Sequence, residues 1–563
     1  MKTNKYLLFG ILLFIVLFTG CKKGFLDRAA TTQQQDKDIF TSYPQTDMVI
    51  NNLYSKLPKV YGYLGGFQMG SATDESKDAS NWMASMTFNS GGLSPTNNPI
   101  GNTWRDYYVM IRQANSILEG VEQYKTPDDG NNPGYLNNRL GEVYFLRAYA
   151  LFELVRQFGG VIIVNQVIQD PNDDASLKKP RSTYDSCVAQ IVADCDIAFQ
   201  KVEAYNYAAK DFGRVTKAAC LALKSRIRLY SASPLWAVAG KTSPLPDISD
   251  NTTASDPAKW EVAAKAAKAL IDYAKGKGYQ LEPDLASRRA MYIQPWNSKE
   301  VLWVRINEEG GSEFERHYFP FGYSGWSAGS VTQNVIDDYE MKDGMPISTS
   351  PLYDPAQPYL NRDPRFYYDI GFNGAYFKNR VIETFVGGRD EQSTATDHSR
   401  TGYYMRKLVD TSQTVGQTSR TTDGIVFRLS EAYLNYAEAL NEYSPGNPDI
   451  ATYINAIRSR AGLPDLPAGL SQGEMRQRIH NERRIELLAE NQRFWDVRRW
   501  KIASQTEQNI YGMKITKDAA LPGGFKYEKF LVEKRPWRNA MLVIPITLDE
   551  TFRNPNLQQN PGW

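Results

Sequence analysis

The chain has 563 residues, of which 42% are hydrophobic, 12% aromatic and 23% charged. This composition is typical of globular proteins and excludes disordered, collagen-like and multi-span membrane proteins. The formal charge of +2 comes from two lysines in the first twenty residues, so the remaining chain is neutral and lacks the basic surface of nucleic-acid-binding proteins.

The first twenty residues have the order of a secretory signal peptide. A short basic start precedes an apolar run from Tyr6 to Phe18, and small residues stand directly before Cys21. As a helix this run would rise about 20 Å, less than the roughly 30 Å hydrocarbon core, which favours an export signal over an uncleaved anchor. The sequence FTGC resembles a bacterial lipobox, although Phe18 stands where Leu is usual. We therefore predict a signal peptide over residues 1–20 and a tether over residues 21–40 that is lipidated at Cys21.

Helical periodicity dominates the first half of the chain. Apolar residues recur every three to four positions between Trp104 and Val121, and Val143 to Phe158 is apolar on nearly all sides, as in a helix packed between neighbours. Capping and helix-ending residues predict three further helices: 182–202, opened by Ser182 and Asp185; 215–231, closed by Pro234; and 260–274, opened by Asp256 and Pro257.

The last third also contains predicted helices, at 430–442, 450–461 and 471–491, the last opened by a capping box of Ser471 and Glu474. Residues 294–427 are different: short strand-like runs at 300–306, 376–385 and 425–429 alternate with long stretches rich in Gly, Asn, Asp and Ser.

Paired helices of this length suggest tetratricopeptide-like stacking. We expect a mainly α fold, in which a helical-hairpin scaffold carries an irregular, loop-rich ligand face and a few short strands. An N-terminal helical region over 41–235 would precede a C-terminal region over 236–563, whose irregular loops lie at about 294–427 and whose recognisable motifs lie at 428–563.

Metal and disulfide chemistry have little support in the sequence. Cys187 and Cys195 lie too far apart along one helix to be bridged. If the helices around 183–203 and 214–233 form a hairpin, Cys195 and Cys220 fall at similar heights. The two cysteines could then form a disulfide, or they could be small apolar residues at a tight helix contact. The three histidines are widely separated, and the aspartates at 128–129 and 170–174 lack the spacing of a calcium loop. We predict no cofactor.

Three glutamates, Glu482, Glu486 and Glu490, stand four apart and would share one face of a helix. Paired carboxylates could act as acid and base in glycoside hydrolysis. However, mixed charges at helical spacing normally form ion-pair networks, and these glutamates are surrounded by Asp496, Arg478, Arg483, Arg484, Arg493, Arg498 and Arg499. The mixed charges favour a structural network over a catalytic pair.

Aromatic residues flanked by Gly, Ser and Asn in predicted loops are the better candidates for ligand contact. Sugar rings stack their C–H faces on aromatic side chains, while amides and carboxylates bond their hydroxyls. We select Trp82, Trp326, Tyr323, Trp296 and Asn81 as ligand-binding residues. Further candidates are the aromatic residues Tyr61, Tyr63 and Phe67 and the polar residues Gln68, Asp74, Glu75 and Asn297.

The chain resembles the SusD/RagB family of outer-membrane nutrient-binding lipoproteins almost from end to end. The resemblance begins with CKKGFLD at Cys21–Asp27 and continues with GEVYFLRAYALFELVRQFGG at Gly141–Gly160. Its most specific stretches are NERRIELLAENQRFWDVRRW at Asn481–Trp500 and IPITLDETFRNPNLQQNPGW at Ile544–Trp563.

This resemblance implies a non-catalytic, lipid-anchored lid that faces outward from the outer membrane. Such a lid captures oligosaccharides, or in some members peptides, for a SusC-type TonB-dependent transporter. The family implies no particular ligand residues, because these lie in its variable loops. The expected function is therefore glycan capture, with a peptide-binding lid and a secreted glycoside hydrolase as alternatives.

Overall fold

The computed structural model describes residues 35–64, 68–170, 172–202, 211–309, 313–416 and 421–563, and α-helix is its main element. Its α-helices are α2 (Asp36–Phe40), α3 (Tyr43–Ser55), α4 (Ser85–Asn89), α5 (Thr103–Tyr124), α6 (Tyr135–Phe158), α7 (Asp174–Leu177), α8 (Tyr184–Lys201), α9 (Lys217–Ala232), α10 (Pro257–Gly276), α11 (Leu285–Ile293), α12 (Glu313–Tyr318), α13 (Gln333–Asp338), α14 (Pro364–Asp369), α15 (Leu429–Tyr443), α16 (Pro448–Ala461), α17 (Gln472–Glu486), α18 (Arg493–Arg499), α19 (Ala503–Thr506) and α20 (Leu548–Arg553).

The described strands pair into two-stranded antiparallel sheets: β1 (Ser76–Lys77) with β3 (Ser330–Val331), β2 (Val301–Glu309) with β8 (Thr422–Arg428), β4 (Ile370–Gly371) with β7 (Tyr404–Met405), β5 (Tyr376–Phe377) with β6 (Arg380–Val381), and β9 (Asn509–Lys517) with β10 (Phe525–Lys534).

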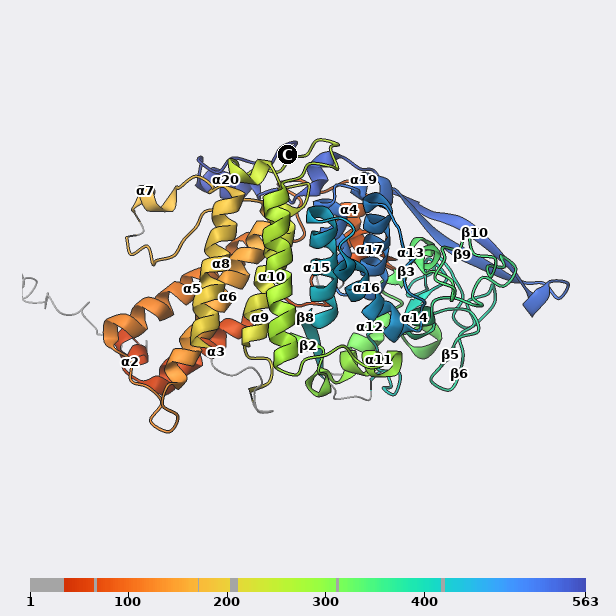
Figure 1. The fold of residues 1–563 in the computed structure, drawn as a ribbon, viewed down its shortest axis with the longest axis horizontal. Helices are drawn as coiled ribbons and strands as arrows, with labels where there is room; N and C mark the ends of the chain where they lie inside the picture. The colour runs from red at the N-terminus through yellow and green to blue at the C-terminus, as the bar shows by residue number, and fades with distance from the viewer. Residues whose placement is uncertain (1–34, 65–67, 171, 203–210, 310–312, 417–420) are drawn as a thin grey trace, which may run out of the picture.

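The long helices stand side by side and form one side of the molecule (Figure 1). Contacts run in order from α5 to α6, α8, α9 and α10, then to α15, which packs against α16 and α17. Because each helix buries its apolar stripe against the next, the expected tetratricopeptide-like helical scaffold is confirmed.

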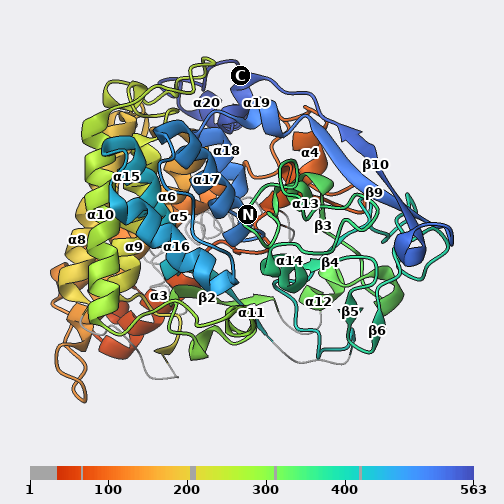
Figure 2. The same ribbon diagram turned by 45° about the vertical axis from the view of Figure 1, so that its right-hand side comes forward.

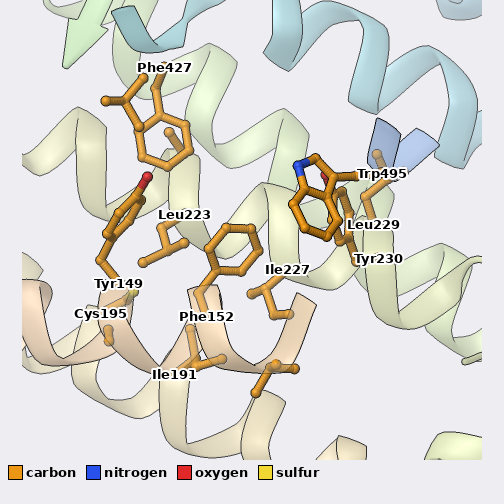
Figure 3. Packing of buried hydrophobic residues seen from close by; sticks show 14 of the residues in the cluster. Tyr149, Phe152, Ile191, Cys195, Leu223, Ile227, Leu229, Tyr230, Phe427 and Trp495 are labelled. Carbon is orange, nitrogen blue, oxygen red and sulfur yellow. The ribbon is translucent and has the colours of Figure 1, made fainter. Parts of the chain in front are cut away.

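The core of this scaffold is rich in aromatic side chains. Tyr149 of α6 points toward Phe427 of β8, and Phe152 of α6 lies beside Ile227 of α9 (Figure 3). Trp495 of α18 belongs to the same cluster. The cluster extends from Phe40 to Leu557, so residues on both sides of the boundary expected near residue 235 share one core. The division into two regions stays a prediction.

The irregular segments and short strands gather on the other side, where the β9–β10 ribbon reaches outward (Figure 2). The strands predicted near 300–306 and 425–429 are present as β2 and β8. The prediction of one strand-like run over 376–385 was wrong. The short strands β5 and β6 form there instead, because Lys378 adopts a φ of 55° and the chain reverses into a hairpin. The β9–β10 pair was not predicted.

Most helix ends follow their local signals. Asp256 accepts a hydrogen bond from Ala258 N at 3.1 Å and caps α10, and Ser471 and Glu474 form the expected capping box on α17. The cap of α8 is Thr183 rather than Ser182.

The predicted helix over 471–491 is too long, because α17 ends at Glu486. Ala489 and Asn491 adopt φ values of 63° and 61°, and the amide of Ala489 donates to Glu75 at 3.1 Å. Glu490 therefore does not share a helical face with Glu482 and Glu486.

Three cysteines in the described part of the chain, Cys187, Cys195 and Cys220, are free and buried. Cys195 of α8 and Cys220 of α9 are buried on two helices that pack against each other, and both thiols are free, so no disulfide joins them. Within the described residues, no helix is both long enough and apolar enough to cross a membrane. The predicted signal peptide and Cys21 lie outside the described residues.

Candidate functional site

The two loops that carry Trp82 and Trp326 emerge together from the β1–β3 ladder. Ser76 pairs with Val331 and Lys77 with Ser330. Because the strands are antiparallel, the chain leaves β1 at the same end at which it enters β3. Behind Trp82, Met83 packs against Ala328, which joins the two loops through an apolar contact.

Asp78 fixes the base of both loops. Its buried carboxylate accepts hydrogen bonds from Ser71 Oγ at 2.7 Å, Ser85 Oγ at 2.5 Å and Gly329 N at 3.3 Å. Burial raises the pKa of this carboxyl, although the three donors act in the opposite direction. One side chain thereby holds the start of the Trp82 loop, helix α4 and the end of the Trp326 loop.

Trp82 is the aromatic residue best placed for a ligand. Its side chain is 77% exposed, and the neighbouring Asn81 is exposed as well. Residues 79–104 contain no charged side chain, so Trp82 lies in a neutral segment rich in Asn, Ser and Gly. Stacking a sugar face on this ring would bury apolar area that the fold leaves in water.

Two further aromatic residues of this face, Trp326 and Tyr323, make contacts within the protein. Trp326 is half-buried, with the His317 ring 5.1 Å and the Arg316 guanidinium 5.5 Å from its ring centroid. Tyr323 donates its hydroxyl to the carbonyl of Phe377 at 2.6 Å and lies beneath the Arg380 guanidinium, 4.2 Å from the ring centroid. Both residues therefore help to hold this face in shape.

A third loop, residues 393–400, contacts both of these loops. The His398 ring stacks on Phe321 at 4.0 Å, and Ser327 Oγ donates to the carbonyl of Asp397 at 2.5 Å. Arg400 Nε donates to the carbonyl of Ala79 at 2.5 Å. We did not predict Phe321, His398 or Arg400 from the sequence. Phe321, which is 44% exposed, stands in the same Gly- and Ser-rich segment as Tyr323 and Trp326, and this signal could have found it.

Trp296 belongs to a different part of the surface. It follows α11 and is 53% exposed, and its ring meets Phe212 at 6.5 Å. Together with Asn297, Tyr279 and Trp303 it lines a groove of about 1010 Å³. The structure therefore brings Asn81, Trp82, Tyr323 and Trp326 onto connected loops, while Trp296 contacts other elements.

Several further candidates are structural. Tyr61 is buried in the core, and the half-buried Tyr63 donates to Glu153 at 2.9 Å. Gln68 is buried, and Asp74 binds Arg493 at 2.8 Å. Burial raises the pKa of Asp74, but Arg484 and Arg493 outweigh it and lower the value to about 2. Phe67 lies outside the described residues.

The three glutamates form a buried ion-pair network. Glu486 accepts from Arg460 at 2.6 Å and from Arg428 at 2.8 Å, with Arg288 and Arg365 both at 3.3 Å. Burial raises the pKa of Glu486, but the four arginines outweigh it and hold the pKa well below its usual range. A carboxyl this acidic and this buried is a poor proton donor at neutral pH.

The neighbouring glutamates are held in the same way. Glu490 binds Lys407 and Arg428, both at 2.7 Å, and Glu482 binds Arg365 at 2.5 Å. The interpretation as a structural network is confirmed. The aspartates that were considered as calcium ligands stabilise local main-chain structure instead. Asp128 accepts a hydrogen bond from the amide of Leu136, and Asp173 caps α7. No group of three or more potential metal ligands occurs among the residues that the structure describes.

Comparisons with known proteins agree with this architecture. Residues 24–229 match a family model described as "Starch-binding associating with outer membrane", and residues 299–563 match the model of the SusD family. A SusD-like protein of Formosa agariphila is 24% identical over an alignment of 584 positions, gaps included, that covers 99% of this chain and 98% of that protein.

Solved structures show the same fold. The crystal structure of a SusD-like protein from Bacteroides fragilis superimposes with a TM-score of 0.77 at 26% identity, covering 94% of this chain and 99% of that one. A SusD-like carbohydrate-binding protein from the same species gives a TM-score of 0.74 at 23% identity, covering 92% of this chain and 100% of that one.

Proposed function

The chain belongs to the SusD/RagB family, and from this premise we propose that it is a non-catalytic lipoprotein that captures an oligosaccharide. The observation that carries the proposal is the exposed Trp82 ring beside Asn81, on a neutral loop that Asp78 and the β1–β3 ladder hold in place. Because the base of the loop is held in place, stacking a ligand on this exposed ring loses little conformational entropy.

Two further observations support a glycan rather than another ligand. The Trp82 loop offers amide and hydroxyl groups and no charge, which suits the hydroxyls of a sugar. One of the matching family models is described as starch-binding, and one structural neighbour as carbohydrate-binding.

Delivery and anchoring complete the proposal. The protein is tethered to the outer membrane through acyl chains on Cys21, faces outward, and passes its glycan to a SusC-type TonB-dependent transporter. The description of the first family model as associating with the outer membrane supports this location. Metabolic labelling with a palmitate analogue tests the tether: the label should enter the wild type and not Cys21→Ser. Co-purification of a barrel protein with the wild type tests the partner.

Calorimetric titration of the full chain in detergent, against oligosaccharides and peptides, tests the function. Each titration is paired with an assay for released product. Binding of a glycan without product supports the proposal. Binding of peptides alone would assign the protein to peptide capture, and product formation would show an enzyme.

A further inference from the structure

Arg400 lies where the loops of the site meet, and in the part of the chain that the structure describes it has no carboxylate partner. Its Nε donates to the carbonyl of Ala79, three residues before Trp82, and its Nη1 lies 3.4 Å from the carbonyl of Ser393. Within the described ranges, no ion pair and no hydrogen bond from Nη2 involves this side chain. Arg400 is only half-buried, so part of it is open to solvent.

Other buried arginines of this chain use most of their guanidinium hydrogen-bond donors. Arg181 also lacks a carboxylate, but its guanidinium makes four hydrogen bonds to the carbonyls of Phe158, Gly160, Pro244 and Gln558. Arg428 has its fork filled by carboxylates, with Glu300 and Glu490 both at 2.7 Å. An arginine carries five N–H donors, and Arg400 uses few of them.

Within the described residues, no carboxylate pairs with Arg400. The carboxylate of Asp78, the residue before Ala79, is buried and already accepts from Ser71, Ser85 and Gly329. Residues 79–104 and 318–336, which carry Trp82 and Trp326, contain no acidic residue. Asp397 lies on the loop of Arg400 itself, and its main-chain carbonyl accepts a hydrogen bond from Ser327. Burial lowers the pKa of Arg400, and no neighbouring carboxylate raises it again.

We propose that Arg400 binds an anionic substituent of the captured glycan, a carboxylate or a sulfate, while Trp82 stacks on a sugar ring nearby. This inference rests on the proposed function and narrows it to acidic oligosaccharides. The planar guanidinium fork matches the paired oxygens of either group, and a charge-assisted bidentate contact gives both affinity and orientation.

The test uses matched probes that differ only in charge. Oligogalacturonate is titrated beside its carboxyl-reduced form, and a sulfated galactan oligomer beside its desulfated form, with wild type, Arg400→Gln, Arg400→Lys and Arg389→Gln. Arg389 is the control, because it is an exposed arginine whose nearest carboxylate, Glu383, lies 3.7 Å away.

We expect the wild type to bind the charged member of one pair at least tenfold more tightly than its neutral counterpart. Arg400→Gln should remove this preference, so that the charged and the neutral probe bind within twofold of each other, whereas Arg389→Gln should keep the preference. The pair that shows the preference distinguishes carboxylate from sulfate. Added salt should weaken only the charged member.

Three results would overturn the inference while the proposed function stands: equal binding of both members of each pair, a preference that survives in Arg400→Gln, or equal loss of both members in a folded Arg400→Lys. If Arg400→Gln does not fold, the decision rests on Arg400→Lys, which keeps the charge and loses the fork. If no glycan binds to the wild type, the proposed function fails, and the inference fails with it.

Discussion

Arg428 joins Glu486 to Glu490: its guanidinium lies 2.8 Å from the first carboxylate and 2.7 Å from the second. Through this one side chain, strand β8 is bound both to the end of helix α17 and to the turn that follows it. Residues 487–490 are ordinary helix formers, yet α17 ends at Glu486 and the chain turns away. The ion pairs of Arg428 therefore stabilise this turn.

Replacing Glu486 by Gln should destabilise the protein without affecting ligand binding. The change leaves Arg288, Arg365, Arg428 and Arg460 with less compensation in a buried site, and breaking one member of such a network costs about 3–5 kcal/mol. Thermal and urea unfolding measure the loss. Glu528→Gln is the matched control, because Glu528 is exposed on β10 and pairs with the exposed Lys526, so its removal should leave the stability almost unchanged. Equal effects of the two substitutions would contradict the network.

Trp82→Ala should weaken glycan binding about tenfold or more, because it removes the stacking surface. The free energy of unfolding should change by less than about 0.5 kcal/mol, since the ring lies mostly in solvent. Phe552→Ala removes an exposed aromatic ring from α20, outside the candidate site, and should leave affinity unchanged. A Trp82→Ala protein that melts early and binds normally would place Trp82 in the core instead of the site.

Asp78→Ala should loosen both loops at once. It removes the acceptor of Ser71 Oγ, Ser85 Oγ and the Gly329 amide, and unpaired buried donors cost about 1–3 kcal/mol. Asp78→Asn is the control. The asparagine keeps one side-chain oxygen that can accept from the Gly329 amide, and the Ser85 hydroxyl can rotate to accept a hydrogen bond from the asparagine NH₂ group. We expect lower affinity and faster acrylamide quenching of tryptophan fluorescence in Asp78→Ala only. Identical behaviour of the two variants would remove Asp78 from its proposed positioning role.

Glu75 should make stability depend on pH between about 4.5 and 7. Burial raises the pKa of this carboxyl to about 7, against the opposing effects of the Ala489 amide and of Arg493 and Arg484. In this window the folded protein keeps a proton that the unfolded chain has released. Raising the pH through the window therefore costs stability, by at most about 3 kcal/mol.

Urea unfolding of wild type and Glu75→Gln at several pH values measures this effect. The variant cannot release the proton, so the difference in stability between variant and wild type should grow as the pH rises from 5 to 7.5. His480 acts in the opposite sense, because burial lowers its pKa to about 3, but it is present in both proteins and cancels from the difference. A difference that stays constant with pH would show that Glu75 titrates normally.

The helical scaffold could be predicted because its signals are local. Apolar spacing located α5 and α6, Pro234 marked the end of α9, and Asp256 and Ser471 marked helix starts. The end of α17 could not be predicted, because Leu487 to Glu490 are ordinary helix formers and a tertiary contact from Ala489 to Glu75 ends the helix. The β9–β10 hairpin did carry a signal, alternation on both sides of Pro522–Gly524, which we did not use.

The site could be predicted only in part. Trp82 and Trp326 stand out as aromatic residues in loops rich in Gly, Ser and Asn. That they share a base depends on a contact between Asp78 and Gly329, which lie 251 positions apart, and one sequence gives no sign of such a pairing. Trp296 has the same local signal and lies among other elements, and Arg400 carries no local signal at all.

The β1–β3 ladder has one more consequence. Its residues are buried, and so is Asp78, whereas Asn81, Trp82 and Phe321 face outward. The side chains that hold the loops are therefore different from those that meet a ligand. Libraries randomised at the outward positions alone should yield folded proteins with new specificities, as antibody frameworks tolerate changes in their hypervariable loops.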